Sequence, residues 1–167
     1  LGIDAEPDEC GKTPEENAII KAKFYGQFFD RVVCNDSGLY FDSLPLDDER
    51  QPGLHIRAPQ GVRLDDEEMI EYYTNLIKKY GGKLTAKWIY GIVIYNGEEA
   101  KKYTWSKSNF YLIDKPCKKR NPGYPLDSIS VMPENNKYWL ELTNEEKRKS
   151  KEEGNKDEVV EFIVNNI

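Results

Sequence analysis

A carboxylate close to a glycine, after an apolar run, is the first feature of this sequence that could do chemistry. Asp36 follows the run from Arg31 to Cys34, which is typical of a short buried strand, and Gly38 permits a sharp change of direction. In α/β sheets a carboxylate at such a strand end commonly presents itself to a metal. From the residues alone, an Asx-turn that Asp36 merely caps is the more frequent arrangement. Both interpretations stay open.

The element before this predicted turn is a helix from Thr13 to Phe29. Thr13 suits the N-cap, Pro14 suits the first helical position, and Glu16 stands where a capping box places its carboxylate. Apolar residues recur along the segment at helical spacing. One face of this helix is therefore expected to pack on a core.

Four short stretches carry a family resemblance. Residues 13–22 read T-P-E-E-N-A-I-I-K-A and residues 35–39 read N-D-S-G-L. In this order and at this separation they resemble the motifs T-F-x-E-N-A-x-x-K-A and D-D-S-G-L of the inosine triphosphate pyrophosphatase family, which acts on noncanonical purine nucleotides. Residues 52–57 resemble its P-G-x-x-S-A-R motif, and residues 141–147 resemble its E-L-x-x-E-x-K motif. Because the likeness runs through nearly the whole chain, we expect a single domain over residues 1–167.

The resemblance implies an α/β fold with a mixed, twisted sheet in two lobes around a nucleotide cleft, and a homodimer. The residues themselves predict a helix opening at Asp65-Asp66, a long strand from Lys83 to Tyr95 and a hairpin turn at Asn96-Gly97. Further strands are expected over residues 101–106, 109–113 and 126–132. A capping box over residues 143–146 predicts another helix, and after Gly154 a last helix over residues 157–167 is expected to bury Val159, Val160, Phe162 and Ile163.

The resemblance also implies a reaction. Water attacks the α-phosphorus of a nucleoside triphosphate and releases pyrophosphate, with Mg²⁺, or Mn²⁺ in its place, to neutralise phosphate charge. Asp36 then matches a catalytic carboxylate and metal ligand, and Glu16 matches a metal ligand that can also cap its helix. Lys21 and Lys147 match lysines near the phosphates, with Lys147 in the catalytic set. An ordinary exposed helix lysine is the alternative for each of the two.

Base recognition is where the sequence departs most from the family. The family motif G-F-G-Y-D-P corresponds to residues 123–128, where Tyr124 still offers a ring for stacking and Asp127 a carboxylate. The family's S-H-R falls at residues 151–153, which read K-E-E, so relaxed or altered base specificity is expected. The residues expected to bind the purine nucleoside triphosphate are Lys21, Ser37, Gly38, Tyr124 and Asp127.

Two further departures bear on activity. Asn35 replaces the first Asp of D-D-S-G-L, which removes one negative charge. The family also has a first strand and an S/T-x-N-x-x-K phosphate loop ahead of the helix, and no such loop occurs before Thr13. The sequence is therefore expected either to be a fragment or to lack this clamp. These departures leave open a relative without turnover that acts as a nucleotide-binding or interaction protein.

Net charge, cysteine spacing and hydropathy argue against several other classes of protein. A formal net charge of −6 argues against a nucleic-acid-binding protein. The 3 cysteines show no CxxC spacing, so a reducing cytoplasm is the expected location. We expect neither a signal peptide nor a membrane span, because the given sequence contains no apolar run long enough to cross a membrane.

Overall fold

The computed structural model describes residue 3 and residues 5–107, 110–152 and 156–167. They form two compact units: the first holds the described residues of 1–38, 89–106 and 155–167, and the second those of 39–88 and 107–154. The elements, in chain order, are α1 (Pro14–Tyr25), β1 (Val32–Phe41), α2 (Asp66–Lys79), β2 (Lys83–Tyr95), β3 (Ala100–Ser106), β4 (Phe110–Ile113), η1 (Pro125–Ser128), β5 (Ser130–Val131), η2 (Trp139–Glu141), α3 (Asn144–Glu152) and α4 (Lys156–Asn166).

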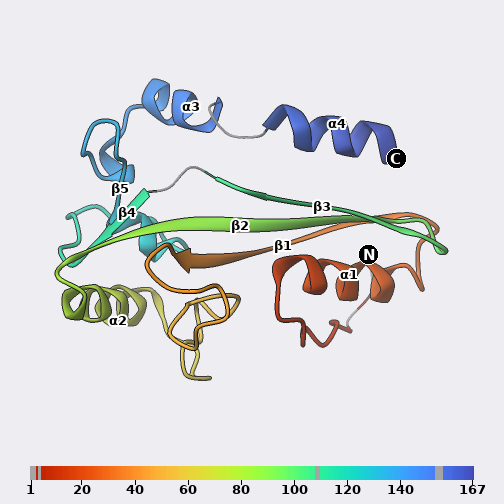
Figure 1. The fold of residues 1–167 in the computed structure, drawn as a ribbon, viewed down its shortest axis with the longest axis horizontal. Helices are drawn as coiled ribbons and strands as arrows, with labels where there is room; N and C mark the ends of the chain where they lie inside the picture. Colours follow the sequence, from red (N-terminus) through yellow and green to blue (C-terminus); the bar gives the residue numbers. More distant parts are fainter. Residues whose placement is uncertain (1–2, 4, 108–109, 153–155) are drawn as a thin grey trace. The chain divides into compact units, whose positions relative to one another are not determined.

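The strands form one open sheet. Its order is β1-β2-β4-β5, and β3 also pairs with β2 (Figure 1). The β2–β3, β2–β4 and β4–β5 pairs are antiparallel. The predicted α/β class is confirmed. Among the described helices, none is long and apolar enough to cross a membrane.

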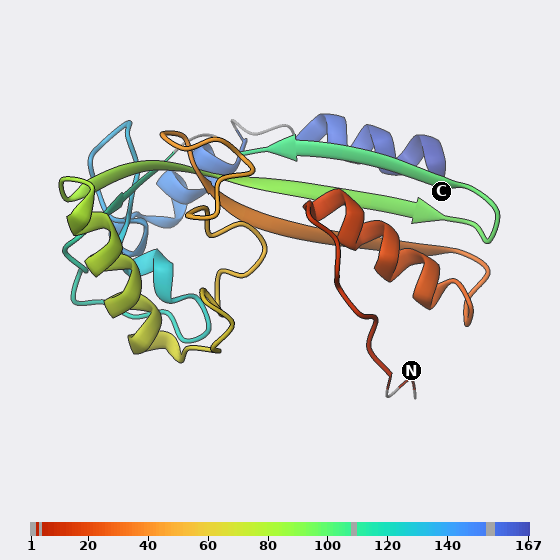
Figure 2. The ribbon, with the colours of Figure 1, turned by 60° about the horizontal axis from the view of Figure 1, so that its bottom comes forward.

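In the first unit, α1 lies along the strands (Figure 2), and the residues that it buries there include small ones. Ala18 and Ala22 are fully buried and cluster with Val93 of β2. The start of α1 meets β2 at Gly91, where a Cβ would lie 2.5 Å from the backbone nitrogen of Glu15. Glycine is therefore needed at this position, because any side chain would push the helix off the strand.

The helix is shorter than the sequence predicted, because α1 ends at Tyr25 rather than at Phe29. Gly26 follows it, and a Cβ there would lie 2.6 Å from the ring of Tyr95. Phe28 is 51% exposed, so the apolar residues beyond Tyr25 do not continue the buried face. The aromatic residues beyond Tyr25 continue the apolar spacing of a helix, but they are not buried in the core.

The predicted acidic turn at residues 35–38 is wrong. These residues lie inside β1, which is a continuous strand of 10 residues. The next three residues, 39–41, are at most 6% exposed, and Leu39 and Phe41 belong to the main core cluster of the second unit. Burial of these side chains keeps the chain extended through a local turn signal, as tertiary contacts commonly override local propensity. Asp36 is a mid-strand residue.

The long hairpin is confirmed. β2 has the predicted bounds, and it pairs with β3 from Tyr95 opposite Ala100 onward. Gly97 has φ +92°, a conformation that glycine adopts without strain. The side-chain oxygen of Asn96 accepts hydrogen bonds from the backbone nitrogens of residues 98 and 99 at 3.1 and 2.8 Å. The turn residues therefore close this hairpin locally.

The second unit is built on α2. The helix begins where the sequence predicted, and a capping box closes its start: Asp65 accepts from the backbone nitrogen of Glu68 at 2.9 Å, and Glu68 accepts from that of Asp65 at 2.8 Å. Tyr73 and Ile77 are fully buried with Leu112 of β4 in the main core cluster. A capped helix with one apolar face thus covers this part of the sheet.

The strand predicted over residues 126–132 is only partly present. The structure has the 3₁₀ helix η1 there, and the strand is limited to β5. The hydroxyl of Ser128 donates to the carbonyl of Pro125 at 2.7 Å, and that of Ser130 donates to the carbonyl of Leu126 at 2.8 Å. Such short-range bonds favour a turn over a strand ladder.

α3 opens with the predicted capping box. Glu146 accepts from the backbone nitrogen of Thr143 at 2.8 Å, and the Thr143 hydroxyl accepts from that of Glu146 at 3.2 Å. Two predicted positions, Asn109 at the start of a strand and Gly154 between the last two helices, lie outside the described residues.

α4 is present where the sequence predicted a helix, but its burial differs. The expected buried set was Val159, Val160, Phe162 and Ile163. Val160 is instead 50% exposed, and the other three are only partly buried. The ring of Phe162 stacks on that of Tyr103 of β3 at 5.5 Å between centroids. α4 therefore contacts β3 with one of its faces, and both elements belong to the first unit.

Candidate active site

In the first unit, the ammonium group of Lys21 lies between two carboxylates. Its Nζ is 3.2 Å from Oδ1 of Asp36 and 3.0 Å from Oε2 of Glu9. Lys21 comes from α1 and Asp36 from β1, on the same strand face as Cys34, which packs against α1. The packing of helix on strand therefore brings together two residues that the sequence predicted to share a site.

The two carboxylates favour the charged form of Lys21. Burial by itself lowers the pKa of Lys21, but hydrogen bonds and charges from Glu9 and Asp36 outweigh it, so the pKa is raised. The side chains of Lys21 and Asp36 are 19% and 17% exposed, which limits screening by solvent. A fixed positive charge next to a carboxylate is suited to hold an anionic substrate near a polar reacting group.

Glu9 is the residue that the sequence analysis missed. Its segment reads as a polar loop before the helix, and its only signal is a carboxylate upstream of the helix cap. Glu16, which the sequence favoured, is exposed, and its Oε2 accepts from the backbone nitrogen of Lys12 at 2.6 Å. The Thr13 hydroxyl accepts from the Glu16 nitrogen at 3.2 Å, so Glu16 takes part in the helix cap. The contact that places a second carboxylate beside the Lys21 ammonium is made by Glu9.

The donor set can be tested against a bound Mg²⁺. Glu9 and Asp36 offer carboxylate oxygens, the ligands that this ion prefers, and Mg²⁺ usually keeps several waters, so two carboxylates are sufficient. Among the described residues, no group of three or more His, Cys, Asp or Glu side chains could hold a metal ion by itself. The pair thus fits a hydrated ion shared with a substrate phosphate and does not fit an all-protein cage.

The neighbours of Asp36 in β1 lie in environments different from that of Asp36 itself. Successive side chains of a strand point to opposite faces, so Asn35 and Ser37 face away from Asp36. Asn35 is exposed, Ser37 is half-buried, and Gly38 is buried. The predicted binding roles of Ser37 and Gly38 stay predictions, since the contacts of the Lys21 cluster within the described part of the chain, with Glu9 and Asp36, do not involve them.

The second unit holds the residues predicted to recognise the base. Tyr124 immediately precedes η1, and its side chain is 67% exposed. Asp127, inside η1, accepts a hydrogen bond from Nδ2 of Asn121 at 2.8 Å. Lys147, in the first turns of α3, has its Nζ 5.4 Å from the ring centre of Trp139, and its charge acts on Asp127. An aromatic ring, a carboxylate and a cation are therefore available in this unit.

Asp127 makes a testable contribution to stability. Burial raises its pKa, which Asn121 and Lys147 only partly oppose, so the ionised form costs folding energy at neutral pH. With the pKa raised in the folded protein, stability is greatest below the unfolded-state pKa and falls as pH rises through the folded pKa. Asp127→Asn is expected to increase the free energy of unfolding at pH 7, because the amide needs no charge burial and still accepts from Asn121.

Urea unfolding from about pH 4 to 7 measures this effect, with the exposed Asp47→Asn as the matched control. The gain from Asp127→Asn should shrink as the pH falls toward the acidic end, whereas the control should follow the wild type throughout. A variant less stable than the wild type at pH 7 would contradict the sign of this shift.

The predicted geometry across the cleft stays a prediction. The Lys21 cluster belongs to the first unit, and Tyr124 and Asp127 belong to the second. Their meeting across one nucleotide cleft is an expectation from the family resemblance.

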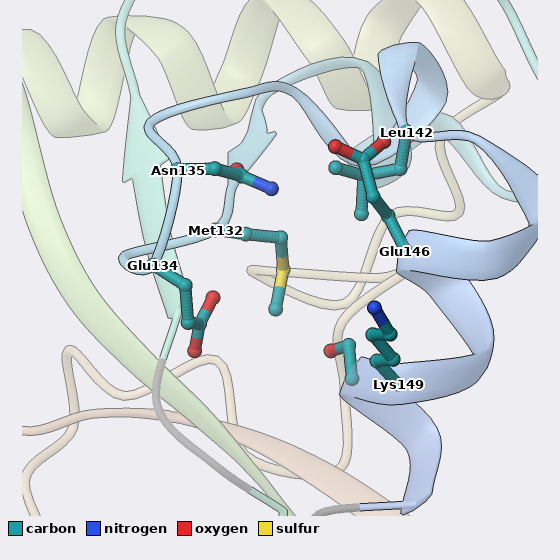
Figure 3. A pocket seen from close by; sticks show the side chains of 7 residues that line it. Met132, Glu134, Asn135, Leu142, Glu146 and Lys149 are labelled. Carbon is teal, nitrogen blue, oxygen red and sulfur yellow. The ribbon is translucent and has the colours of Figure 1, made fainter.

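A separate pocket of about 170 Å³ lies in the second unit (Figure 3). Met132 and Leu142 supply its apolar part, and polar side chains from a loop and from α3 complete it. Glu146 on its rim is already bound to Lys137 at 2.6 Å. None of the residues that the sequence predicted for the site lines this pocket.

Comparison with known proteins decides the family. The profile of the Ham1 family matches residues 1–155. The chain belongs to the Ham1 family. The match extends through the motifs that carried the sequence resemblance, and α4 begins just after it.

Individual relatives of this Ham1 chain agree with the assignment. A dITP/XTP pyrophosphatase of Bacillus subtilis is 29% identical over 151 residues, which are 89% of this chain and 73% of that protein. One of Halalkalibacterium halodurans is 31% identical over 144 residues, covering 85% of this chain and 71% of that protein. The structure of the Staphylococcus aureus Ham1 protein superposes with a TM-score of 0.67 at 26% identity, covering 86% and 72% of the two chains.

Proposed function

We propose that this protein is a metal-dependent nucleoside triphosphate pyrophosphohydrolase that acts on noncanonical purine nucleotides. It would convert a triphosphate and water into a monophosphate and pyrophosphate, with relaxed base specificity. The observation that carries the proposal is the Lys21 ammonium held between Glu9 and Asp36. The relatives named dITP/XTP pyrophosphatase support both the reaction and the substrate class.

In this proposal the first unit carries the chemistry. Asp36 orients the attacking water and accepts its proton, while Lys21 neutralises charge on the phosphate oxygens. A Mg²⁺ ion held by Asp36 and Glu9 would supply further charge neutralisation. Because Lys21 already contacts both carboxylates, a bound triphosphate would share its ammonium group with them.

The second unit would bind the base. The exposed ring of Tyr124 is suited to stack on a purine, and Asp127 can accept a hydrogen bond from it. Lys147 would add positive charge on the phosphate side. Residues 151–153, K-E-E, lack the His and Arg donors expected for a 6-oxo purine. Each lost donor lowers discrimination by about 1–3 kcal/mol, so selectivity weakens before chemistry is lost.

Asn35 is the observation that favours a second candidate function. With an amide in place of the first Asp of the motif, this segment carries one negative charge fewer. A chain with this change could bind nucleotides without turning them over. The substitution faces away from the Lys21 cluster along β1, and for that reason we favour the enzyme.

We further propose that the protein is a cytoplasmic homodimer. The dimer rests on the family resemblance, and the reducing location rests on cysteines that form no disulfide framework. Sedimentation equilibrium tests the dimer directly. A monomer at high micromolar concentration would overturn that part of the proposal.

The experiment for the proposed function is pyrophosphate release across a nucleotide panel. Inosine, deoxyinosine, xanthosine, adenosine and guanosine triphosphates are each incubated with the purified protein, with Mg²⁺ or with a chelator. Release is expected only with the metal, and kcat/KM for inosine and adenosine triphosphates should differ by less than about a hundredfold. A stronger preference would contradict the relaxed pocket, and no release from any nucleotide would favour the binding protein.

A further inference from the structure

The backbone of Gly123, next to Tyr124, is held on both sides by one ion pair. Nη1 of Arg57 lies 2.9 Å from Oδ1 of Asp66. Nη2 of the same guanidinium donates to the carbonyl of Gly123 at 3.1 Å, and the Gly123 nitrogen donates to Oδ2 of Asp66 at 2.7 Å. The three contacts close a ring, which we call the Gly123 clamp, and all of its residues lie in the second unit.

The clamp acts on a residue whose own conformation is unusual. Gly123 has φ +84°, and a Cβ there would meet nothing within 4 Å. Glycine is therefore present for its backbone conformation and not for lack of space. With its donor and its acceptor both bound, the peptide groups that lead into Tyr124 have a defined direction.

The ring of Tyr124 has little else to position it. It is 67% exposed, so packing does not fix its place. On the other side of the clamp, the Tyr124 nitrogen donates to the carbonyl of Asn121 at 2.8 Å, and Asn121 in turn binds Asp127. Backbone anchoring thus determines the point from which this ring projects, and it connects the backbone of Tyr124 with Asp127 through Asn121.

The clamp is itself anchored on a rigid element. Asp66 is the first residue of α2, directly after the Asp65 cap. The Gly123 N–H and the Arg57 guanidinium both lower the pKa of Asp66, which keeps it a charged acceptor. A second tie joins the same loop to the same helix end, since Nε of Arg120 donates to Glu67 at 2.7 Å. Side chains held by a helix end are positioned more reliably than those on a free loop.

We propose that Arg57 and Asp66 are positioning residues that preorganise Tyr124 for stacking on the substrate's purine. The inference rests on the proposed function, because it assigns a role to that same binding site. A preorganised ring saves the cost of ordering it on binding, so loss of the clamp weakens nucleotide affinity and leaves the chemical step unchanged. The alternative is that the ion pair only stabilises the second unit.

A double-mutant cycle separates the two roles. Arg57→Lys keeps the charge but loses the planar fork that reaches two acceptors at once. We expect it to raise KM for inosine triphosphate about five- to tenfold with kcat within about twofold. In a Tyr124→Ala background the same change should have no further effect on KM, because the ring that it positions is gone. Equal effects in both backgrounds would overturn the proposal.

Matched variants control for folding and for charge. Arg63→Lys changes an exposed arginine of the same loop and should leave KM unchanged. Asp66→Asn keeps one side-chain acceptor where the clamp uses two, so it should raise KM in the same direction as Arg57→Lys. Urea unfolding of each variant shows whether enough folded protein remains for the comparison.

Measuring nucleotide affinity for the four proteins of the same double-mutant cycle distinguishes this inference from the proposed function. Inosine triphosphate is titrated calorimetrically with Mg²⁺ into the four proteins of the cycle. If the wild type binds the nucleotide without releasing pyrophosphate, the proposed function fails, while a Tyr124-dependent loss of affinity in Arg57→Lys still supports the clamp. If affinity falls equally with and without Tyr124, or the wild type does not bind, the clamp proposal is overturned.

Discussion

Asp36→Asn is expected to lower kcat for pyrophosphate release by a factor of about 10² to 10⁴, the range that a positioned general base contributes. The substitution keeps the size of the side chain and removes the basic oxygen that would orient the attacking water. It also leaves Lys21 with a single anionic partner, Glu9, 3.0 Å from its ammonium group. Steady-state kinetics with saturating inosine triphosphate and Mg²⁺ measure the loss.

The control for this variant is Asp30→Asn, an exposed aspartate shortly before β1. It should keep the wild-type kcat, and both variants should unfold near the wild-type urea concentration. An Asp36→Asn protein that is folded and fully active would show that the catalytic carboxylate lies elsewhere.

Glu9→Gln should raise the Mg²⁺ concentration needed for half-maximal activity by at least about tenfold. The reason is structural: Glu9, and not Glu16, shares the Lys21 ammonium with Asp36. Replacing its carboxylate by an amide removes a charged oxygen ligand for the hard cation. Activity measured against Mg²⁺ concentration gives the shift directly.

Glu16→Gln is the matched variant, because it makes the same chemical change in the same segment. The glutamine keeps an acceptor for the Lys12 nitrogen that Glu16 binds at 2.6 Å, so both the helix cap and the metal requirement should stay near wild type. If Glu16→Gln raises the metal requirement and Glu9→Gln does not, the sequence-based assignment of Glu16 is correct and the structural one is wrong.

The parts of the fold that the sequence predicted well are those determined by local signals. The helix after Asp65 has a reciprocal cap, strong apolar periodicity and two terminal glycines, and its observed bounds follow them. The strand from Lys83 to Tyr95 and its turn at Gly97 combine β-branched residues with a left-handed turn position. In these segments propensity, pattern and turn chemistry agree, so little is left for tertiary contacts to change.

The errors occur where tertiary burial decides. The local turn signal at residues 35–38 is outweighed by burial of residues 39–41, which extends β1. α1 stops at Tyr25, although aromatic residues continue the pattern.

The candidate site also contains some residues that the sequence predicted and others that only tertiary contacts determine. The family resemblance implied that Lys21 and Asp36 belong to one site, and their side chains do meet, at 3.2 Å. The sequence does not distinguish Glu9 from the other acidic residues of its segment. Its contact with Lys21 depends on the path of a loop that has no periodic pattern from which this path could be predicted. The Gly123 clamp was equally out of reach, since Arg57 and Gly123 are 66 positions apart in sequence.

Isotope labelling tests the central claim, pyrophosphohydrolysis at the α-phosphorus, most directly. Inosine triphosphate is hydrolysed by the protein with Mg²⁺ in ¹⁸O-labelled water, and the products are resolved by mass spectrometry. We predict inosine monophosphate that carries one labelled oxygen, together with unlabelled pyrophosphate, because water attacks the α-phosphorus and pyrophosphate leaves. Label in the pyrophosphate, or inosine diphosphate with labelled phosphate, would contradict the account.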